Sequence, residues 1–242
     1  MLTNYIILLN CVLYLSVNKA VSQKYDCKRG RDISDIATKD MFLFAAENRK
    51  FPINAQEMKQ FCKESPELDI KVKTFNDNCL KGITKQISNL YVYSVNKFAS
   101  GVCKSKRRTI EFLSIGQCGN AANKSNKKCW DNWLFTTDSI GDIKDDKLKI
   151  PLSCCLVARM RSCLEQSFEK KPKQCKKQHI EVLDNMFNTF LVDSMAMLCG
   201  DYTEDGDKCD KIVNKIPNRP FDPKKKLSPI IIMTKILSSF PE

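Results

Sequence analysis

The stretch that decides the fold is PLSCCLVARMRSCLEQSF, residues 151–168. Its apolar residues and its three cysteines recur at the three-to-four spacing of a helix face. Cys154 and Cys155 are neighbours in the chain, so on a helix their side chains point in different directions and should reach two different partners. Pro151 is tolerated in a first helical turn, and Pro172 marks the end of the pattern. The stretch predicts a central helix that disulfides link to two neighbours.

Cysteine is used heavily along the chain, with thirteen in 242 residues. Cys11 lies in an apolar leader, and removing the leader leaves twelve cysteines, which can close six disulfides. Zinc ligation is the alternative, but the chain has no CxxC pair and a single histidine, so neither a metal nor a cofactor is expected. The pairing cannot be deduced from the sequence. The predicted disulfide cysteines are Cys27, Cys62, Cys79, Cys103, Cys118, Cys129, Cys154, Cys155, Cys163, Cys175, Cys199 and Cys209.

The leader is the apolar run YIILLNCVLYLSV at residues 5–17. It has the length of the hydrophobic region of a signal peptide and is too short to cross a bilayer. Ala20 and Ser22 supply the small residues that signal peptidase accepts, so we expect cleavage after Ser22. No later segment predicts a transmembrane helix. The mature protein is therefore expected to be secreted and extracellular.

Helical periodicity extends over most of the mature chain. One long helix is predicted from Asn78 to Cys103, and a second over residues 180–198, before Gly200. The weaker pattern between Cys118 and Ile150, with a loop-like stretch at 139–147, predicts a shorter helix. Alternating strand patterns are absent. The predicted fold is an all-α, disulfide-stapled helical bundle.

Two further helices are predicted near the N-terminus of the mature chain. Asn54 and Glu57 form a capping box before an apolar run, which indicates a short helix from about Ala55. Residues 33–47 predict another helix.

Composition and turn residues divide the chain into three parts. We expect a signal peptide over residues 1–22, a disulfide-rich helical domain over 23–212, and an extended Pro/Lys-rich tail over 213–242. Ser228 and Pro229 favour the start of an amphipathic helix in this tail, which is expected to fold back on the domain. Its predicted apolar face is Ile230, Met233, Ile236, Leu237 and Phe240.

The chain is basic, with a formal net charge of +12. Lys19 is the one charged residue of the leader, so the mature chain keeps a charge near +11. Clustered cations attract polyanionic glycans or acidic proteins with a salt-dependent affinity, although a solvated lysine-rich surface is the plainer interpretation. Aromatic residues do not interleave with the basic runs, so no nucleic-acid partner is expected. The predicted polyanion-binding residues are Lys104, Lys106, Arg107, Arg108, Lys170, Lys171, Lys173, Lys176 and Lys177.

Catalytic patterns do not emerge from the sequence. The chain has no GxSxG, HExxH or GxxxxGK[ST] motif, and its single histidine, His179, lies in a lysine-rich first helical turn. The protein is therefore not expected to be an enzyme, and a hydrolase with an unrecognised site is the remaining alternative. Asn123-Lys124-Ser125 forms the one acceptor sequon with a non-proline middle residue, so Asn123 is the predicted site of N-glycosylation.

The cysteine spacing resembles a known group of proteins. The residues that carry the resemblance are Phe51-Pro52 with Asn54 and Cys62, Lys73-Thr74-Phe75 before Cys79-Leu80, then Cys103, the Cys118 to Cys129 interval, Cys154-Cys155, Cys163 and Cys175. This pattern is similar to that of secreted, cysteine-rich arthropod proteins, which include haemolymph glycoproteins of the twenty-seven-kilodalton type. The resemblance implies a helical extracellular protein without established chemistry, and it transfers no functional residue.

The favoured function is that of a secreted binding or carrier protein. Helices held apart by disulfides can enclose an apolar cavity for a small hydrophobic or amphipathic ligand, with basic residues at its mouth for an acidic head group. The alternative is a cationic protein that binds polyanionic glycans or another extracellular protein. A large apolar cavity would favour the first function, and a solid core with one-sided positive charge the second.

Overall fold

The structure is a computed structural model of the chain, and it describes residues 25–192, 198–200, 202, 207–219, 222 and 227–238. The described residues form helices and contain no strand, which confirms the predicted all-α class. The predicted signal peptide, residues 1–22, lies outside the described part of the chain. Within that part, none of the helices has the length and apolar content that crossing a membrane requires.

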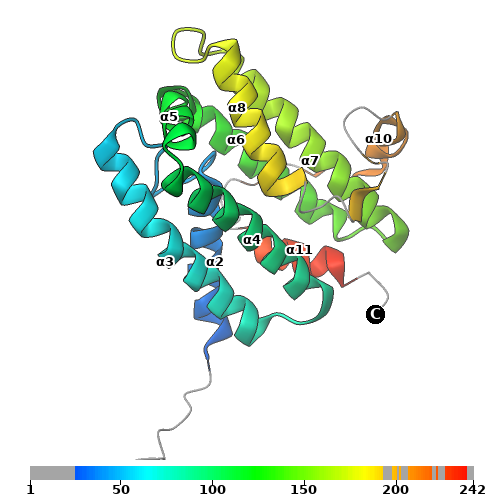
Figure 1. Ribbon diagram of the computed structural model, residues 1–242. Coiled ribbons are helices and arrows are strands. Elements are labelled where there is room, and N and C mark those ends of the chain that lie inside the picture. The colour runs from blue at the N-terminus through cyan, green and yellow to red at the C-terminus, as the bar shows by residue number, and fades with distance from the viewer. Residues whose placement is uncertain are drawn as a thin grey trace, which may run out of the picture.

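Two antiparallel groups of helices make up the molecule (Figure 1). The first group packs α2 on α3 and α3 on α4, and the second packs α6 on α7 and α7 on α8. The helices of the two groups are α2 (Cys27–Phe42), α3 (Ala55–Cys79), α4 (Gly82–Lys104), α5 (Lys106–Ser114), α6 (Gly116–Ile140), α7 (Asp146–Glu169) and α8 (Lys177–Phe187). The short helix α5 turns the chain from the first group into the second.

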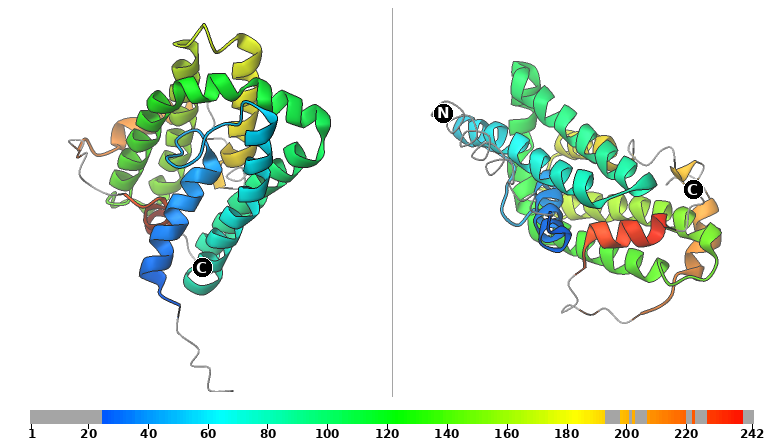
Figure 2. Two further views of the ribbon diagram at one scale, coloured as in Figure 1. Left: turned by 90° about the vertical axis from the view of Figure 1, so that its left-hand side faces the viewer. Right: turned by 90° about the horizontal axis from the view of Figure 1, so that it is seen from below.

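Shorter elements follow α8. They are the π-helix η1 (Asn188–Val192), α10 (Lys208–Ile212), the 3₁₀ turn η2 (Val213–Lys215) and α11 (Pro229–Leu237). The C-terminal helix α11 contacts α2, α4, α6 and α7, and Figure 2 shows it lying across the second group when the molecule is seen from below. The expectation that the C-terminal segment folds back on the domain is confirmed, although Phe240 lies outside the described residues.

The predicted helix from Asn78 to Cys103 is wrong, because the chain breaks at Leu80 and Lys81. Leu80 is extended at ψ 150°, and Gly82 at φ +52° takes a left-handed conformation that other residues rarely adopt. The helix from Ala55 is consequently long rather than short, since α3 runs for 25 residues and accommodates Pro66. The predicted N-cap is confirmed, because the Asn54 side chain accepts the Glu57 N–H, although the Glu57 carboxylate accepts the Ile53 N–H rather than the backbone N–H of Asn54.

The weakest sequence signal belongs to one of the longest helices. Instead of a shorter helix with a loop from residue 139, α6 spans 25 residues to Ile140. Polar residues that obscured its pattern make hydrogen bonds inside the fold: the side-chain oxygen of the buried Asn126 accepts a hydrogen bond from Ser167, and the Thr137 hydroxyl donates to the Trp133 carbonyl.

Three other helix boundaries differ from the prediction. The helix expected over residues 33–47 is α2, which starts earlier because the Asp26 carboxylate accepts two backbone N–H groups of its first turn. The central helix α7 begins at Asp146, so Pro151 lies in its second turn rather than its first. The stripe predicted over 180–198 leaves α-helical geometry at Asn188, and residues 193–197 lie outside the described part.

Six disulfides join the elements, and none lies within a single helix. Adjacent Cys154 and Cys155 pair with different partners, Cys199 and Cys209, as predicted. The pairs are Cys27–Cys79, Cys62–Cys103, Cys118–Cys175, Cys129–Cys163, Cys154–Cys199 and Cys155–Cys209. This number of disulfides indicates folding in an oxidising compartment.

Aromatic side chains fill the space between the two groups of helices. Phe42 at the end of α2 lies 5.0 Å from Trp130 of α6 and 6.0 Å from Phe187 of α8, measured between ring centroids. Phe44 is also fully buried, because Leu43 at φ +65° turns the chain sharply between the two phenylalanines. In the core, the N-terminal helices therefore contact the central helices through aromatic side chains.

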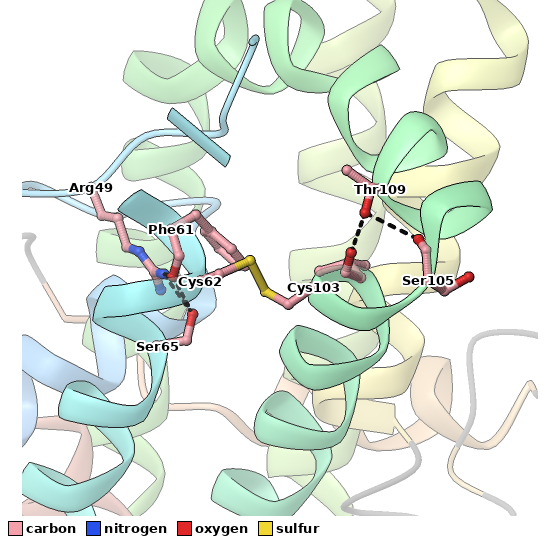
Figure 3. Close-up of a disulfide and its surroundings, with 8 residues drawn as sticks. Arg49, Phe61, Cys62, Ser65, Cys103, Ser105 and Thr109 are labelled. Atoms are coloured by element: carbon pink, nitrogen blue, oxygen red, sulfur yellow. Dashed lines mark hydrogen bonds between the residues drawn. A yellow bond between two sulfur atoms is a disulfide. The ribbon is translucent and has the colours of Figure 1, made fainter. Parts of the chain in front are cut away.

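A buried arginine packs beside one disulfide (Figure 3). The Arg49 guanidinium donates hydrogen bonds to the Phe61 carbonyl and the Ser65 hydroxyl, at 2.6 and 2.7 Å, and lies 4.0 Å above the Phe61 ring. Burial lowers the pKa of Arg49 to about 10, so it stays charged at neutral pH. The disulfide between Cys62 and Cys103 connects α3 to α4 at this level.

Replacing Cys62 and Cys103 together by alanine is expected to lower the free energy of unfolding by about 3 kcal/mol, because the unfolded chain loses a closed loop. The two residues are 41 positions apart. The melting temperature should fall by about 10 °C, with the helical circular dichroism retained at low temperature. An unchanged melting temperature would contradict the assigned pairing, and Lys104→Ala on the adjacent surface is the control that should leave the melting temperature nearly unchanged.

Candidate functional site

An apolar cavity of about 150 Å³ lies between α11 and the helices beneath it. Helix α11 forms one wall with Pro229, Ile230, Ile232, Met233, Ile236 and Leu237. The other walls are Thr38 of α2, Ile87, Ser88 and Tyr91 of α4, Trp130, Trp133 and Thr137 of α6, Ile150, Ser153 and Val157 of α7, and Leu191 and Leu198. None of these described lining residues carries a charge, so the basic residues expected at the mouth of a cavity are not part of its wall.

Most hydroxyl groups in the wall are already engaged with the protein. The Tyr91 hydroxyl donates to the Thr38 carbonyl at 3.1 Å, and burial raises the pKa of Tyr91 above its ordinary value. Ser88 donates to the Asn76 side chain, and Ser153 donates to the Lys149 carbonyl of its own helix. These groups hold the wall together and leave it apolar toward the cavity.

Helix α11 is attached to the domain without a disulfide, because the last cysteine of the chain is Cys209. Four apolar side chains fix it, and each of them is buried: Ile230, Ile232, Ile236 and Leu237. The Lys235 ammonium pairs with Asp142, which also pairs with Arg219 of the preceding segment. The cavity thus has one wall that can separate from the others without breaking a covalent bond.

The start of α11 rests on a carboxylate of α2. Asp35 accepts a hydrogen bond from the Ile230 N–H at 3.3 Å and interacts with the Ser228 side chain. Burial raises the pKa of Asp35 to about 6. The hydrogen bonds and the nearby charge of Arg31 lower the pKa, but their effect is smaller than that of burial. The Ser228 hydroxyl in turn accepts the Ile231 N–H, which confirms the predicted helix start.

The predicted polyanion-binding residues lie away from the cavity, at the end of the molecule that is uppermost in Figure 1. Lys104 ends α4, and Lys106, Arg107 and Arg108 form the first turn of α5, all four of them exposed. The remaining five lie at the end of α7, in the turn after it and at the start of α8: Lys170, Lys171, Lys173, Lys176 and Lys177. The structure separates the two proposed sites, so binding at one does not require the other.

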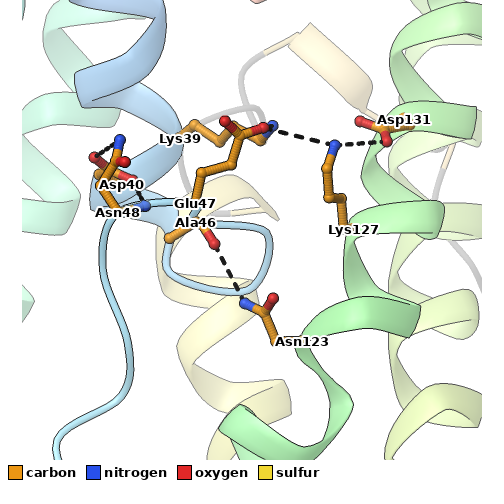
Figure 4. Close-up of polar contacts among 8 residues, drawn as sticks. All are labelled: Lys39, Asp40, Ala46, Glu47, Asn48, Asn123, Lys127 and Asp131. Carbon is orange, nitrogen blue, oxygen red and sulfur yellow. Dashed lines mark hydrogen bonds and ion pairs between the residues drawn. The ribbon is translucent and has the colours of Figure 1, made fainter. Parts of the chain in front are cut away.

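Asn123 lies in the interior of α6, where its side-chain nitrogen donates to the Ala46 carbonyl at 3.3 Å (Figure 4). A glycan would be attached to this same nitrogen. Beside it, Lys127 pairs with Asp131 on α6 and with Glu47 of the loop after α2. N-glycosylation at Asn123 stays a prediction, and modification would have to displace the contact with the loop.

Candidate catalytic or metal-binding groups are sparse. His179 lies in the first turn of α8, where its Nδ1 is 3.3 Å from the Lys176 backbone nitrogen and 3.1 Å from the Gln174 carbonyl oxygen, so the side chain is engaged with the start of its own helix. Among the described residues, no group of three histidine, cysteine, aspartate or glutamate side chains is arranged to hold a metal ion.

Comparisons of the chain with protein-family models, with curated proteins and with solved structures give no match. The resemblance to secreted arthropod proteins therefore stays a prediction.

Sequence reasoning located α11 but missed the residues opposite it. The predicted apolar face of this helix omitted Ile232, which is buried and lines the cavity, whereas its neighbour Ile231 is exposed. Trp130 and Trp133, three positions apart, mark the facing surface of α6.

We expect α11 to dock more firmly at pH 5 than at pH 7.5. Asp35 has a pKa of about 6 when α11 is docked, against an ordinary value of 3.8, so the docked state binds the proton more tightly. The free energy of docking α11 onto the domain should become more favourable by about 1 kcal/mol as the pH falls through 6. Hydrogen exchange of the α11 amides, corrected for the intrinsic effect of pH, measures this difference.

Asp35→Asn is the matched control, because the amide mimics the protonated carboxyl and cannot titrate. The difference in protection between the two pH values should disappear in this variant. Stronger protection of α11 at pH 7.5 than at pH 5 in the unmodified protein would contradict the expected sign.

Proposed function

We propose that this protein is a secreted extracellular carrier of a small hydrophobic molecule, which binds in the cavity under α11 without catalysis. The observation that carries the proposal is the nearly wholly apolar wall of a partly open cavity lined by five helices, because native proteins rarely leave unfilled apolar space of this size. The predicted leader and the six disulfides support export into an oxidising compartment. No cofactor is part of the proposal.

The volume of the cavity limits the ligand. A cavity of about 150 Å³ takes a molecule of roughly benzene size when the protein keeps its conformation. Such a molecule buries roughly 200 Å² of apolar surface, which corresponds to about 5 kcal/mol and a dissociation constant on the order of 0.1 to 1 mM. Tighter binding of a longer molecule would require α11 to move outward.

Access to the cavity is proposed to occur by displacement of α11. The other elements that form the wall are held by disulfides or by long helix contacts, whereas α11 is held by apolar burial, the Asp35 contacts and the Lys235–Asp142 pair. Reversible opening of one wall allows a ligand to exchange without unfolding of the domain.

The first experiment is extraction of the protein from its native fluid followed by mass spectrometry of the bound organic molecules. A small apolar compound present in stoichiometric amount would support the carrier function. Protein that carries no small molecule and that does not bind toluene in solution would overturn it.

Val157→Phe is expected to abolish toluene binding, because the larger side chain occupies the cavity from α7. Val157 is buried and lines the cavity, so the added ring fills existing space and the melting temperature should stay the same or rise. Ligand-observed NMR should show at least a tenfold weaker toluene affinity. Ile231→Phe on the exposed side of α11 is the control and should bind toluene as the unmodified protein does.

A second candidate function is the binding of polyanionic glycans or acidic proteins, favoured by the exposed cations where α4 meets α5. Four of them lie within five residues of the chain: Lys104, Lys106, Arg107 and Arg108. This surface does not overlap the cavity wall, so the proposal stands or falls independently of the carrier function.

The triple variant Lys106→Ala, Arg107→Ala and Arg108→Ala is expected to elute from immobilised heparin at a clearly lower salt concentration than the unmodified protein. The control removes the same charge from exposed positions on α3, Lys59, Lys63 and Lys71. If binding is site-specific, the salt concentration needed for elution should fall further for the α5 variant than for the α3 control, since long-range attraction alone depends on net charge. An equal decrease in the elution salt concentration for both variants, or retention that salt does not weaken, would count against a specific site.

A further inference from the structure

The turn between α7 and α8, which projects at the top of Figure 1, concentrates unpaired positive charge. Residues 170–177 contain five lysines, and no aspartate or glutamate lies between Glu169 and Glu181. Four of the five lysines are exposed, and the fifth is half-buried. No carboxylate in the described part of the chain pairs with any of these ammonium groups, whereas Lys73 and Lys235 elsewhere do form ion pairs.

The backbone that carries these lysines is fixed. Cys175 lies among them, and its disulfide to Cys118 ties the turn to the start of α6, with both cysteines buried. Within the turn, the Cys175 N–H donates to the Lys171 carbonyl at 2.8 Å, and Pro172 restricts the backbone next to it. An anion that binds here has to order lysine side chains but not the chain itself, which lowers the entropic cost of binding.

The stability of the helices does not account for all of these charges. The C-terminal end of a helix attracts cations, so Lys170 and Lys171 are favourably placed at the end of α7. Lys176 and Lys177 lie at the opposite end of α8, where the helix dipole repels cations and the first turn has no acidic residue. Lys173 belongs to neither helix. Lys173, Lys176 and Lys177 are therefore the charges that the fold itself does not require.

The cations of α5 are less well suited to binding a polyanion. Glu111 is exposed and lies one helical turn after Arg107, so its carboxylate reduces the positive potential there. The Arg108 guanidinium lies over Gly101 of α4, because a β-carbon added at Gly101 would come within 2.5 Å of it. The turn after α7 has neither a neighbouring carboxylate within residues 170–177 nor a lysine side chain engaged in this way.

The composition of the turn favours a glycan over a membrane or a nucleic acid. Residues 170–177 contain no aromatic and no large aliphatic side chain. Peripheral membrane binding adds apolar side chains to basic ones, and binding of single-stranded nucleic acid adds aromatic side chains for stacking. Five lysines in eight residues instead match a polymer with closely spaced anionic groups, such as a sulfated glycan.

We propose that the turn between α7 and α8 is the principal contact for a sulfated glycan chain, with Lys173, Lys176 and Lys177 as the cations that determine its affinity. The proposal rests on the second candidate function, polyanion binding, and deepens it. It assigns the stronger contact to a disulfide-fixed turn rather than to α5, and it names the chemical class of the partner.

The first test is the triple variant Lys173→Ala, Lys176→Ala and Lys177→Ala on immobilised heparin, beside the α5 triple variant and the α3 control. All three variants lose the same net charge, so long-range attraction weakens equally in them. The turn variant should elute at the lowest salt concentration of the three, with its melting temperature nearly unchanged. Hyaluronan, which carries carboxylates and no sulfates, should displace the unmodified protein from heparin less effectively than soluble heparin does.

A second test removes the constraint on the backbone without changing the net charge. Cys118→Ala together with Cys175→Ala frees the turn, so the affinity for heparin should fall by roughly threefold. Cys27→Ala together with Cys79→Ala is the matched control, because it opens a loop of similar length, 52 against 57 residues, away from the turn. The control should elute from heparin as the unmodified protein does, with both double variants compared at a temperature at which they are folded.

The outcomes separate the proposal from the function on which it rests. An α5 variant that elutes at a salt concentration equal to or lower than that of the turn variant, with both below the α3 control, would overturn the proposal and leave polyanion binding in place. Equal decreases for all three variants would overturn both. Equal competition by hyaluronan, or binding to vesicles of anionic phospholipid without binding to heparin, would overturn the assignment of a sulfated glycan.

Discussion

The covalent connection of α7 to the chain that follows α8 is the constraint on which the rest of the structure depends. Cys154 and Cys155 point to different sides of α7 and hold Cys199 and Cys209 against it. Leu198, next to the first of these bonds, is thereby fixed as part of the cavity wall. The second bond fixes the place from which the chain leaves toward α11. These two neighbouring residues therefore fix one part of the cavity wall and the point from which the chain leads toward α11.

The sequence predicts such constraints well where they are local. The divergence of Cys154 and Cys155, the N-cap at Asn54 and the helix start at Ser228 depend on geometry within a few residues, and all three are confirmed. The helix α6 is different, because its polar residues are stabilised by partners far along the chain, such as Ser167 for Asn126. Periodicity counts such residues as exposed, so it underestimates the helix.

The cavity is hidden from the sequence for a related reason. A residue that lines an empty space and a residue that packs in a solid core have the same apolar character, and only the fit between α11 and the facing helices tells them apart. Likewise, the sequence predicts the cysteines but not their pairing, because the pairing depends on how α2 to α8 are arranged in space.

An unfilled cavity of this size lowers stability, by roughly 3 to 4 kcal/mol at the usual cost per unit of cavity volume. One disulfide contributes a similar amount, about 2 to 4 kcal/mol. A domain of this length has enough residues for a stable core without disulfides, so six of them leave a surplus. That surplus is large enough to offset the cost of a cavity whose wall α11 is held without a covalent bond. Under the proposed carrier function, a ligand that fills the cavity would supply the packing contacts that its walls lack, and it would stabilise the folded state by an amount set by its concentration and affinity.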